Sequence, residues 1–464
     1  MGKTYNSAYI FGITLIATIG GLLFGYDTAV ISGAEKSIQI LFEPLGLGTF
    51  AHGATVSSAL IGCIIGGAIS GFFANRFGRK KSLLIAAFLF FTSALGSAYP
   101  EFLLFEKGEA SIGLLSMFNF YRIWGGIGVG LASAVTPTYI GEISPAEIRG
   151  RLVSCNQFAI IFGMLVVYFV NWGIANGQTM EWVNDIGWRY MFLSEAIPAG
   201  LFFILLFFVP ETPRYLALIK NEQKALAILE KINTSKEKAK SILDEISATI
   251  GEKSKSRIFS YGKKVIIIGI LLSVFQQFVG INVALYYAPR IFEGMGVARD
   301  ASMFQTIVMG LVNVIFTVVA IMTVDKWGRK PLLITGSIGM AVGMIAISAL
   351  SFFHIMETMP LLMLVFIVIF TASFMMSWGP ICWVYISELF PNKIRGQAVA
   401  IAVAAQWAAN YFISSTYHGM MEFSSVFTYG FYGVMAVISA LFVWKMVPET
   451  KGKSLEQIEK FWKK

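Results

Sequence analysis

Three ionisable side chains interrupt stretches of sequence that are otherwise apolar. Asp27, Arg122 and Glu195 each lie within such a stretch, away from the charged connections. An ionised Asp at the centre of a bilayer costs about 2.5 to 3.5 kcal/mol, so it must be paired, neutral or in contact with water. Arg122 is the obvious partner of Asp27, and the pair could be either a static link between helices or a proton switch. In a switch, Asp27 stays ionised while Arg122 is close and takes up a proton when the two separate.

A second set of residues consists of amides and aromatic side chains that also lie inside apolar stretches. Amides donate and accept hydrogen bonds and therefore suit the hydroxyl groups of a sugar, whereas aromatic faces suit its C–H surface. Any one buried amide could equally join two helices, but a set of ten favours a binding site for a polyhydroxylated solute. Asn282 and Tyr286 are four residues apart, as are Gln406 and Asn410, so each pair shares a helix face. The set comprises Gln157, Gln276, Gln277, Asn282, Tyr286, Asn313, Trp383, Gln406, Trp407 and Asn410.

Charged motifs recur in the two halves of the chain. NRFGRKK from Asn75 is echoed by DKWGRKP from Asp325, GEISPAEIRG by SELFPNKIRG, and PETPR by PETKG. Membrane topology alone does not explain why a Glu recurs at matching positions in both halves, because acidic residues contribute little to the orientation of membrane helices. Two parallel six-helix repeats with a site at their interface are typical of transporters that rock between two states. The recurring charges are Arg79, Glu142, Arg149 and Glu211 in the first half, and Arg329, Glu388, Arg395 and Glu449 in the second.

The elements that must hold these residues are membrane-spanning helices. Of the 464 residues, 56% are hydrophobic and 14% are charged, whereas soluble proteins have about 25% charged residues. Twelve stretches approach the length of about 20 apolar residues that crosses a bilayer. We therefore predict an all-α membrane protein with twelve transmembrane helices in two six-helix repeats and an intracellular helical linker. The predicted divisions are a first half at 1–209, the linker at 210–264, a second half at 265–447 and a cytoplasmic tail at 448–464.

The net charge of +9 is explained by membrane topology rather than by binding to nucleic acid. Most Lys and Arg residues lie in connections expected on the same side as the linker, which the positive-inside rule makes the cytoplasmic side. Both termini are therefore predicted to be cytoplasmic, with the lipid bilayer around the spans. The residues expected on the opposite side are Lys36, Lys107, Arg189, Arg290 and Arg299.

The sequence favours neither an enzyme nor a cofactor or metal site. HExxH and G-x-S-x-G motifs are missing. GGIGVG at 125–130 resembles a nucleotide-binding loop but lies within a predicted span, where small residues serve helix packing. The three histidines, His52, His354 and His418, are expected to lie apart from any second ligand.

The motifs resemble those of the sugar porter family of the major facilitator superfamily over essentially the whole chain. Long runs such as GGLLFGYDTAVISG from Gly20 and VFQQFVGINV from Val274 are most similar to bacterial members that carry D-xylose with a proton. The resemblance implies a carrier in the bacterial cytoplasmic (inner) membrane that imports a monosaccharide with protons by alternating access. We expect a monomer without a cofactor.

The resemblance also implies roles for individual residues. Asp27 would be the proton site, with Arg122 as its partner and Glu195 as a neighbour that modulates it. Passive members of the family generally have an amide in place of Asp27, so the carboxyl group favours symport over a passive uniporter. The recurring charges would form salt bridges between helices that latch the outward-facing state. Those implied to bind sugar are Gln157, Gln276, Gln277, Asn282, Asn313, Trp383 and Gln406, while Tyr286, Trp407 and Asn410 would line or gate the cavity.

Three further positions bear on sugar identity and movement. Gly379 and Pro380 resemble a break in the tenth span that lets its outer part bend over a bound sugar. Met164 lies two helical turns after Gln157, where xylose carriers have a second Gln, and one lost hydrogen bond costs about 0.5 to 1.5 kcal/mol. Hexose carriers often have an apolar residue there, whereas Leu285 retains the residue of xylose carriers. D-xylose is therefore predicted first, with glucose or galactose as the alternative.

Overall fold

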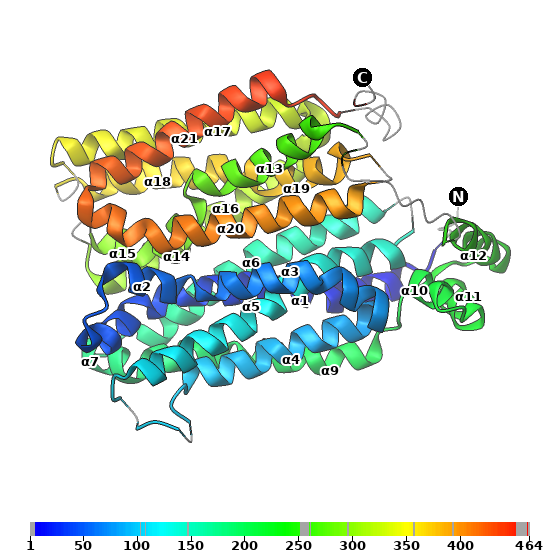
Figure 1. Ribbon diagram of the computed structural model, residues 1–464, viewed down its shortest axis with the longest axis horizontal. Coiled ribbons are helices and arrows are strands. Elements are labelled where there is room, and N and C mark those ends of the chain that lie inside the picture. The colour runs from blue at the N-terminus through cyan, green and yellow to red at the C-terminus, as the bar shows by residue number, and fades with distance from the viewer. Residues whose placement is uncertain are drawn as a thin grey trace.

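The computed structural model is a bundle of long helices (Figure 1). It describes residues 5–250 and 259–451 together with Trp462, apart from gaps at 103, 107, 146–147, 260, 295–296, 356–357 and 392–393. Within these residues, 12 helical segments are long and apolar enough to cross a membrane. The predicted all-α membrane fold is confirmed.

Six spans form the first half of the bundle. The first span is the long helix α1, and the sixth combines several short helices between Met180 and Phe208. The helices are α1 (Ser7–Phe42), η1 (Glu43–Leu45), α2 (Gly48–Val56), α3 (Ser58–Phe77), α4 (Arg79–Ala98), α5 (Ile112–Ile143), α6 (Arg149–Ala175), α7 (Met180–Trp182), η2 (Val183–Gly187), α8 (Trp188–Ser194), α9 (Ala196–Leu205) and η3 (Leu206–Phe208).

Three short helices follow, and six further spans form the second half. Figure 1 places α10, α11 and α12 together at one end of the bundle. They are α10 (Pro213–Leu218), α11 (Glu222–Ile232) and α12 (Lys236–Ile250). The second half contains α13 (Lys263–Phe278), α14 (Ile281–Tyr286), α15 (Ala288–Glu293), α16 (Arg299–Trp327), α17 (Arg329–Phe352), α18 (Pro360–Met375), α19 (Trp378–Leu389), α20 (Arg395–Phe423) and α21 (Ser425–Met446).

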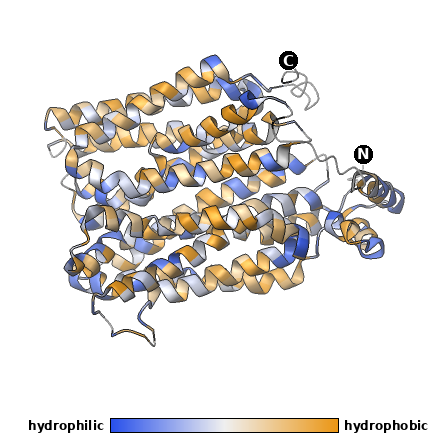
Figure 2. Cartoon of the chain, viewed as in Figure 1, coloured by the Kyte–Doolittle hydropathy of each residue, from blue (hydrophilic) through white to orange (hydrophobic). Residues whose placement is uncertain are grey.

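Hydrophobic residues dominate the long helices, and hydrophilic residues gather at their ends and on α11 and α12 (Figure 2). Many large apolar side chains are exposed on the bundle, among them Ile197 and Phe208 of the sixth span, which are 76% and 78% exposed. Water would penalise this surface, whereas lipid accommodates it. The outward-facing apolar residues therefore belong against a bilayer.

Glycines bring helices of the first half into close contact. A Cβ atom at Gly25 of α1 would lie 1.8 Å from the backbone oxygen of Ile160 in α6. At Gly126 of α5, the corresponding distance to the backbone oxygen of Ala59 in α3 is 1.9 Å. Only glycine permits such approaches, which are typical of packed membrane helices.

Two spans of the second half are interrupted. The seventh breaks between α13 and α14 at Gly280, whose φ of 87° favours glycine. The tenth breaks between α18 and α19 at Met376 and Ser377, slightly before the position predicted from Gly379 and Pro380. Those two residues lie in the first turn of α19 instead, where a proline removes no helical hydrogen bond.

Candidate functional site

A cavity lies between the two halves of the bundle. The empty space in it, including the space open to solvent, is about 600 Å³. Helices α1 and α6 line it from the first half, and α13, α14, α18, α19 and α20 line it from the second. A solute bound here would contact both halves at once.

Every predicted substrate-site residue except Asn313 lines this cavity. Asn313 is buried in α16 outside the cavity, and its Oδ1 atom has no hydrogen-bond partner among the described residues. The resemblance implied a sugar contact for Asn313, whereas this conformation does not place it among the residues that line the cavity. The residues that do line the cavity are Gln157, Met164, Gln276, Gln277, Asn282, Tyr286, Gly379, Trp383, Gln406, Trp407 and Asn410.

The amides next to the break at Gly280 form a connected chain. Asn282 Nδ2 donates to Gln277 Oε1 over 2.5 Å, and Gln277 Nε2 donates to Gln276 Oε1 over 3.3 Å. Gln276 Nε2 in turn donates to the backbone oxygen of Trp378, 2.9 Å away across the break of the tenth span. These bonds orient the amides on one wall of the cavity, and each amide retains capacity for further bonds.

Two polar atoms on α20 lack partners. Gln406 Oε1 and Trp407 Nε1 are buried, belong to cavity-lining residues and have no hydrogen-bond partner within the described part of the chain. Leaving a buried polar group unpaired costs about 1 to 3 kcal/mol. One of these atoms accepts and the other donates, so hydroxyl groups, which do both, could satisfy the two.

Phe24 and Thr28 of α1 also line the cavity but were not predicted. The ring of Phe24 lies 5.6 Å from the ring of Trp407 across the two halves, which provides an aromatic surface for the C–H face of a solute. Both residues flank Asp27 in the sequence. Their spacing of four residues places them on one helix face, and this signal could have identified them.

Asp27 and Arg122 form a buried ion pair behind the cavity wall. Arg122 Nη1 donates to Asp27 Oδ1 over 2.7 Å, and Nη2 donates to the backbone oxygen of Asp27 over 3.2 Å. The guanidinium group also lies 5.3 Å from the ring of Phe192. The pairing joins α1 to α5 and leaves Asp27 Oδ2 without a partner among the described residues.

Glu195 lies next to this ion pair, where the sixth span is interrupted between α8 and α9. It is 1% exposed, and its carboxyl group is close enough to Asp27 and Arg122 to interact with both. Two neighbouring carboxyl groups and one guanidinium group are hard to accommodate without water unless a proton neutralises one acid. The three residues thus form one buried cluster of charged groups.

This buried charge cluster and the cavity share a helix. Asp27 faces Arg122, while the next residue, Thr28, lines the cavity. Tyr286 on the opposite wall is also within electrostatic reach of Asp27 and Arg122, and its hydroxyl group accepts a hydrogen bond from Asn410 Nδ2 over 3.3 Å. Movement of α1 would therefore affect both the Asp27–Arg122 ion pair and the cavity wall.

At the end of the bundle that carries α10 to α12, Glu211 caps a helix. Its carboxylate accepts hydrogen bonds from the backbone N–H groups of Arg79 and Lys80 at the start of α4, and from that of Thr212. Burial raises the pKa of Glu211, while these N–H groups act in the opposite direction. An anion at a helix N-terminus is stabilised by the free N–H groups there.

The second half repeats this arrangement. Glu449 accepts hydrogen bonds from the backbone N–H groups of Arg329 and Lys330 at the start of α17, and from that of Thr450. Both glutamates were expected to form salt bridges between side chains. Among the described residues, each carboxylate bonds to the unpaired N–H groups of a neighbouring helix N-terminus, and Glu211 is also within electrostatic reach of Arg79.

Among the other recurring charges, Arg79 Nη2 and Glu142 Oε1 are 2.8 Å apart and link α4 to α5. Arg149 was also expected in a salt bridge, but it is exposed at the start of α6 and has no ion pair among the described residues. The side chains of Glu388 and Arg395, predicted as their counterparts, lie outside the described residues.

Residues 13–462 match a family described as "Sugar (and other) transporter". The chain belongs to the sugar transporter family. This transporter is 52% identical to a D-xylose-proton symporter of Escherichia coli K12 over 100% of its own length and 97% of the relative's. It is 37% identical to a glucose facilitated diffusion protein of Zymomonas mobilis, covering 100% of this chain and 99% of that one.

A solved structure has the same fold. The transporter superposes on the inward-open conformation of the Escherichia coli xylose transporter with a TM-score of 0.88, at 50% identity, over 98% of its own chain and 100% of the other. The family and the superfamily fold predicted from the motifs are confirmed. Membership of this family also makes the protein a transporter rather than an enzyme.

Proposed function

We propose that this protein imports a monosaccharide, D-xylose in the first place, together with a proton by alternating access. The observation that carries the proposal is the position of Asp27 on α1. It pairs with Arg122 on one side, while its neighbour Thr28 lines a cavity rich in amides on the other. A sugar in the cavity and a proton on Asp27 would thus act on the same helix.

The proposed sugar binding uses polar atoms of the cavity that lack hydrogen-bond partners among the described residues. The unpaired atoms of Gln406 and Trp407 require partners that hydroxyl groups can supply. The connected amides from Gln276 to Asn282 flank the break in the seventh span, whereas Gln157 lines the cavity from the first half. Bonds to Gln157 and to these second-half amides would be made together only while the two halves stay close, which favours a closed state around the sugar.

Proton coupling follows from the ion pair. While Asp27 is ionised, its attraction to Arg122 holds α1 against α5. A proton on Asp27 removes this attraction and frees Arg122 to interact with Glu195, which lies beside it. The protonation state therefore alters the packing of α1, and with it the balance between the two access states.

The arrangement of ion pairs at the two ends supports access from the side of α10 to α12. At the opposite end, Lys36 pairs with Glu293 over 2.5 Å and joins the two halves. Near α10 to α12, the pair Arg79–Glu142 stays within the first half. The excess of Lys and Arg near α10 to α12 supports their cytoplasmic location, with both termini on that side of a bacterial inner membrane.

The choice of sugar depends on the cavity wall at Met164 and Leu285, which both line the cavity. Met164 offers no hydrogen bond where an amide would bind a hydroxyl group, and this favours a hexose. Leu285 and the 52% identity to a D-xylose-proton symporter favour xylose. A glucose or galactose symporter remains the second candidate on the observation at Met164.

A vesicle experiment tests the proposal. Adding D-xylose to the outside of right-side-out vesicles should raise the external pH as protons enter with the sugar. Competition of pentoses and hexoses against labelled xylose would identify the preferred substrate. If the correct sugar enters without any rise in external pH, the protein is a passive uniporter, as the name of the Zymomonas relative describes that protein.

A further inference from the structure

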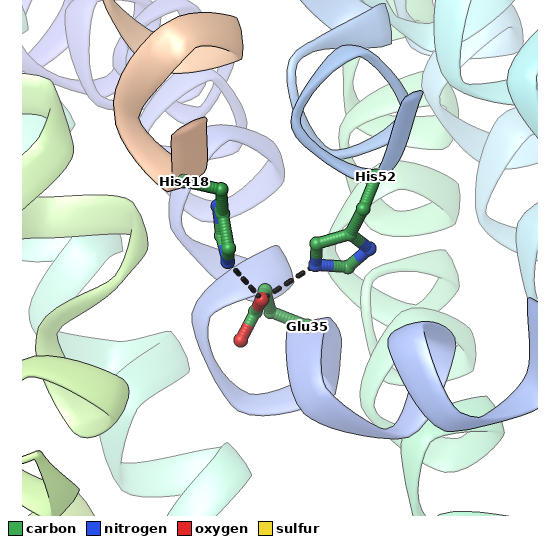
Figure 3. A group of neighbouring side chains, drawn as sticks. All are labelled: Glu35, His52 and His418. Carbon is green, nitrogen blue, oxygen red and sulfur yellow. Dashed lines mark hydrogen bonds and ion pairs between the residues drawn. The ribbon is translucent and has the colours of Figure 1, made fainter. Parts of the chain in front are cut away.

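Two histidines and a glutamate meet at the end of the bundle away from α10 to α12 (Figure 3). Glu35 belongs to α1, His52 to α2 and His418 to α20. His52 Nε2 lies 2.6 Å from Glu35 Oε1, and His418 Nε2 lies 3.1 Å from the same oxygen. The expectation that the histidines lie apart from any second ligand is therefore wrong for these two, because helix packing joins residues far apart in sequence.

The cluster has the composition and spacing of a metal site. One ligand atom from each residue lies within 4.8 Å of the others. Glu35 is 2% exposed and His418 is 4% exposed, and His418 Nδ1 has no hydrogen-bond partner among the described residues. Two imidazole nitrogens and one carboxylate oxygen form a ligand set that suits Zn²⁺ and similar divalent transition metals.

We propose that Glu35, His52 and His418 bind a divalent transition-metal ion such as Zn²⁺ between the two halves of the transporter. A metal bound here completes its coordination with water, because zinc prefers four ligands. The ligand atoms already lie within 4.8 Å of one another, and both imidazole rings point toward the carboxylate of Glu35 in Figure 3, so side-chain movements would bring them around one ion.

Arg290 is a charged neighbour that must release the Glu35 carboxylate before a metal can bind there. Its Nη1 atom lies 2.6 Å from Glu35 Oε1 and 2.5 Å from Gln39 Oε1. Gln39 therefore still accepts a bond from Arg290 when the carboxylate binds a metal. Lys36 and Arg299 lie 2.5 Å and 4.0 Å from the two oxygens of Glu293, so this neighbouring group carries a single net positive charge.

The site links metal binding to the conformation of the transporter. Glu35 and His52 belong to the first half, whereas His418 belongs to the second. All three can bind one ion only while the two halves meet at this end. The ion therefore stabilises that state and opposes the opening of the cavity toward this end. Under the proposed transport cycle, which this consequence assumes, Zn²⁺ slows sugar uptake.

Direct binding to the purified full-length protein tests the site without assuming transport. Zn²⁺ binding is measured by competition with a chromophoric chelator, and Co²⁺ is used as a visible-absorbing substitute. We expect His52→Gln and His418→Gln to weaken Zn²⁺ binding by at least about tenfold, as loss of even a supporting residue often does. Gln preserves a polar side chain that can donate to Glu35, so both variants should fold.

The third histidine provides a matched control. His354 is exposed beyond the end of α17 and is not part of the cluster, so His354→Gln should bind Zn²⁺ like the unmodified protein. Equal Zn²⁺ affinity in all variants would overturn the proposal, as would a Co²⁺ spectrum that does not depend on His52 or His418. Folding of each variant is checked by its thermal unfolding temperature.

Transport gives a second readout. External Zn²⁺ should slow xylose uptake into right-side-out vesicles for the unmodified protein and for His354→Gln, but much less for His52→Gln and His418→Gln. If Zn²⁺ binds as proposed and the vesicles transport no sugar even without it, the proposed function fails while the metal site stands. Inhibition that is equal in all four proteins would overturn the link between this site and conformation.

Discussion

Arg122 Nη1 lies 2.7 Å from Asp27 Oδ1, and the two side chains are 2% and 0% exposed. Such burial makes the pair costly to separate while both groups are charged, since one charge would be left without a partner. A proton on Asp27 removes that cost. Under the proposed transport cycle, separation of α1 from α5 would therefore accompany protonation of Asp27.

Replacing Asp27 with Asn should abolish accumulation of sugar against its gradient while leaving exchange of labelled sugar across the membrane. The amide retains the shape and can bond to its neighbours but does not titrate near neutral pH. The measurement compares uptake and exchange in energised vesicles. Asp185→Asn is the control because Asp185 is an exposed acid of η2. A D27N variant that still concentrates sugar would show that the proton binds elsewhere.

Replacing Gln277 with Ala should weaken sugar binding at least about tenfold. Gln277 contacts both Gln276 and Asn282, so its loss removes its own bonds to the sugar and disorders two neighbouring amides. Two hydrogen bonds at about 1 kcal/mol each exceed the 1.4 kcal/mol that corresponds to a tenfold change. Equilibrium binding of labelled xylose to the purified protein measures the effect.

Gln305→Ala is the matched control for that variant. Gln305 is an amide of α16 that does not line the cavity, so its removal should leave the affinity for xylose unchanged. Asn313→Ala provides a further comparison, because Asn313 lies outside the cavity in this conformation. Unchanged affinity in Gln277→Ala would rule out the proposed position of the sugar.

Changing Met164 to Gln should raise the preference for xylose over glucose by about two- to tenfold. One new hydrogen bond to a hydroxyl group contributes about 0.5 to 1.5 kcal/mol, which corresponds to that range. Competition of both sugars against labelled xylose gives the ratio of affinities in one assay. An identical ratio before and after the change would mean that position 164 does not select the sugar.

The fold and most of the cavity could be predicted from the sequence because they depend on local signals. The apolar stretches determine which segments span the membrane, and an amide inside such a stretch needs a polar partner. Gln277, Gln406 and Asn410 line the cavity for this reason. Asn313 carries the same signal but faces elsewhere, since the rotation of α16 about its axis depends on packing against its neighbours.

Interactions between distant segments were not predictable in the same way. The meeting of Glu35, His52 and His418 requires α1, α2 and α20 to converge at one end of the bundle. The spacing of Glu35, His52 and His418 along the sequence does not indicate that these helices converge. Similarly, the PETPR motif shows that Glu211 is charged but not that the N-terminus of α4 lies beside it. Only the arrangement of helices distinguishes a helix cap from a salt bridge.

The capping geometry of Glu211 predicts that Gly78→Ala destabilises the protein. Gly78 has a φ of 91°, and a Cβ atom there would lie 2.3 Å from Glu211 Oε2 and 2.7 Å from Tyr215 Cε1. A residue held in such a backbone conformation costs about 1 to 3 kcal/mol, and displacement of the carboxylate also weakens the cap on α4. The thermal unfolding temperature in detergent should therefore fall.

Gly71→Ala in α3 is the control for Gly78→Ala. A Cβ atom at Gly71 meets nothing within 4 Å, and alanine favours a helix over glycine by up to about 1 kcal/mol, so the unfolding temperature should stay equal or rise.

Gly328→Ala tests the repeat, since Gly328 has a φ of 92° and its Cβ would lie 2.8 Å from Glu449 Oε2. We expect it to destabilise the second half as Gly78→Ala does the first. If Gly78→Ala unfolds at the same temperature as Gly71→Ala, the backbone at position 78 does not require glycine and Glu211 does not hold α4 in the way described.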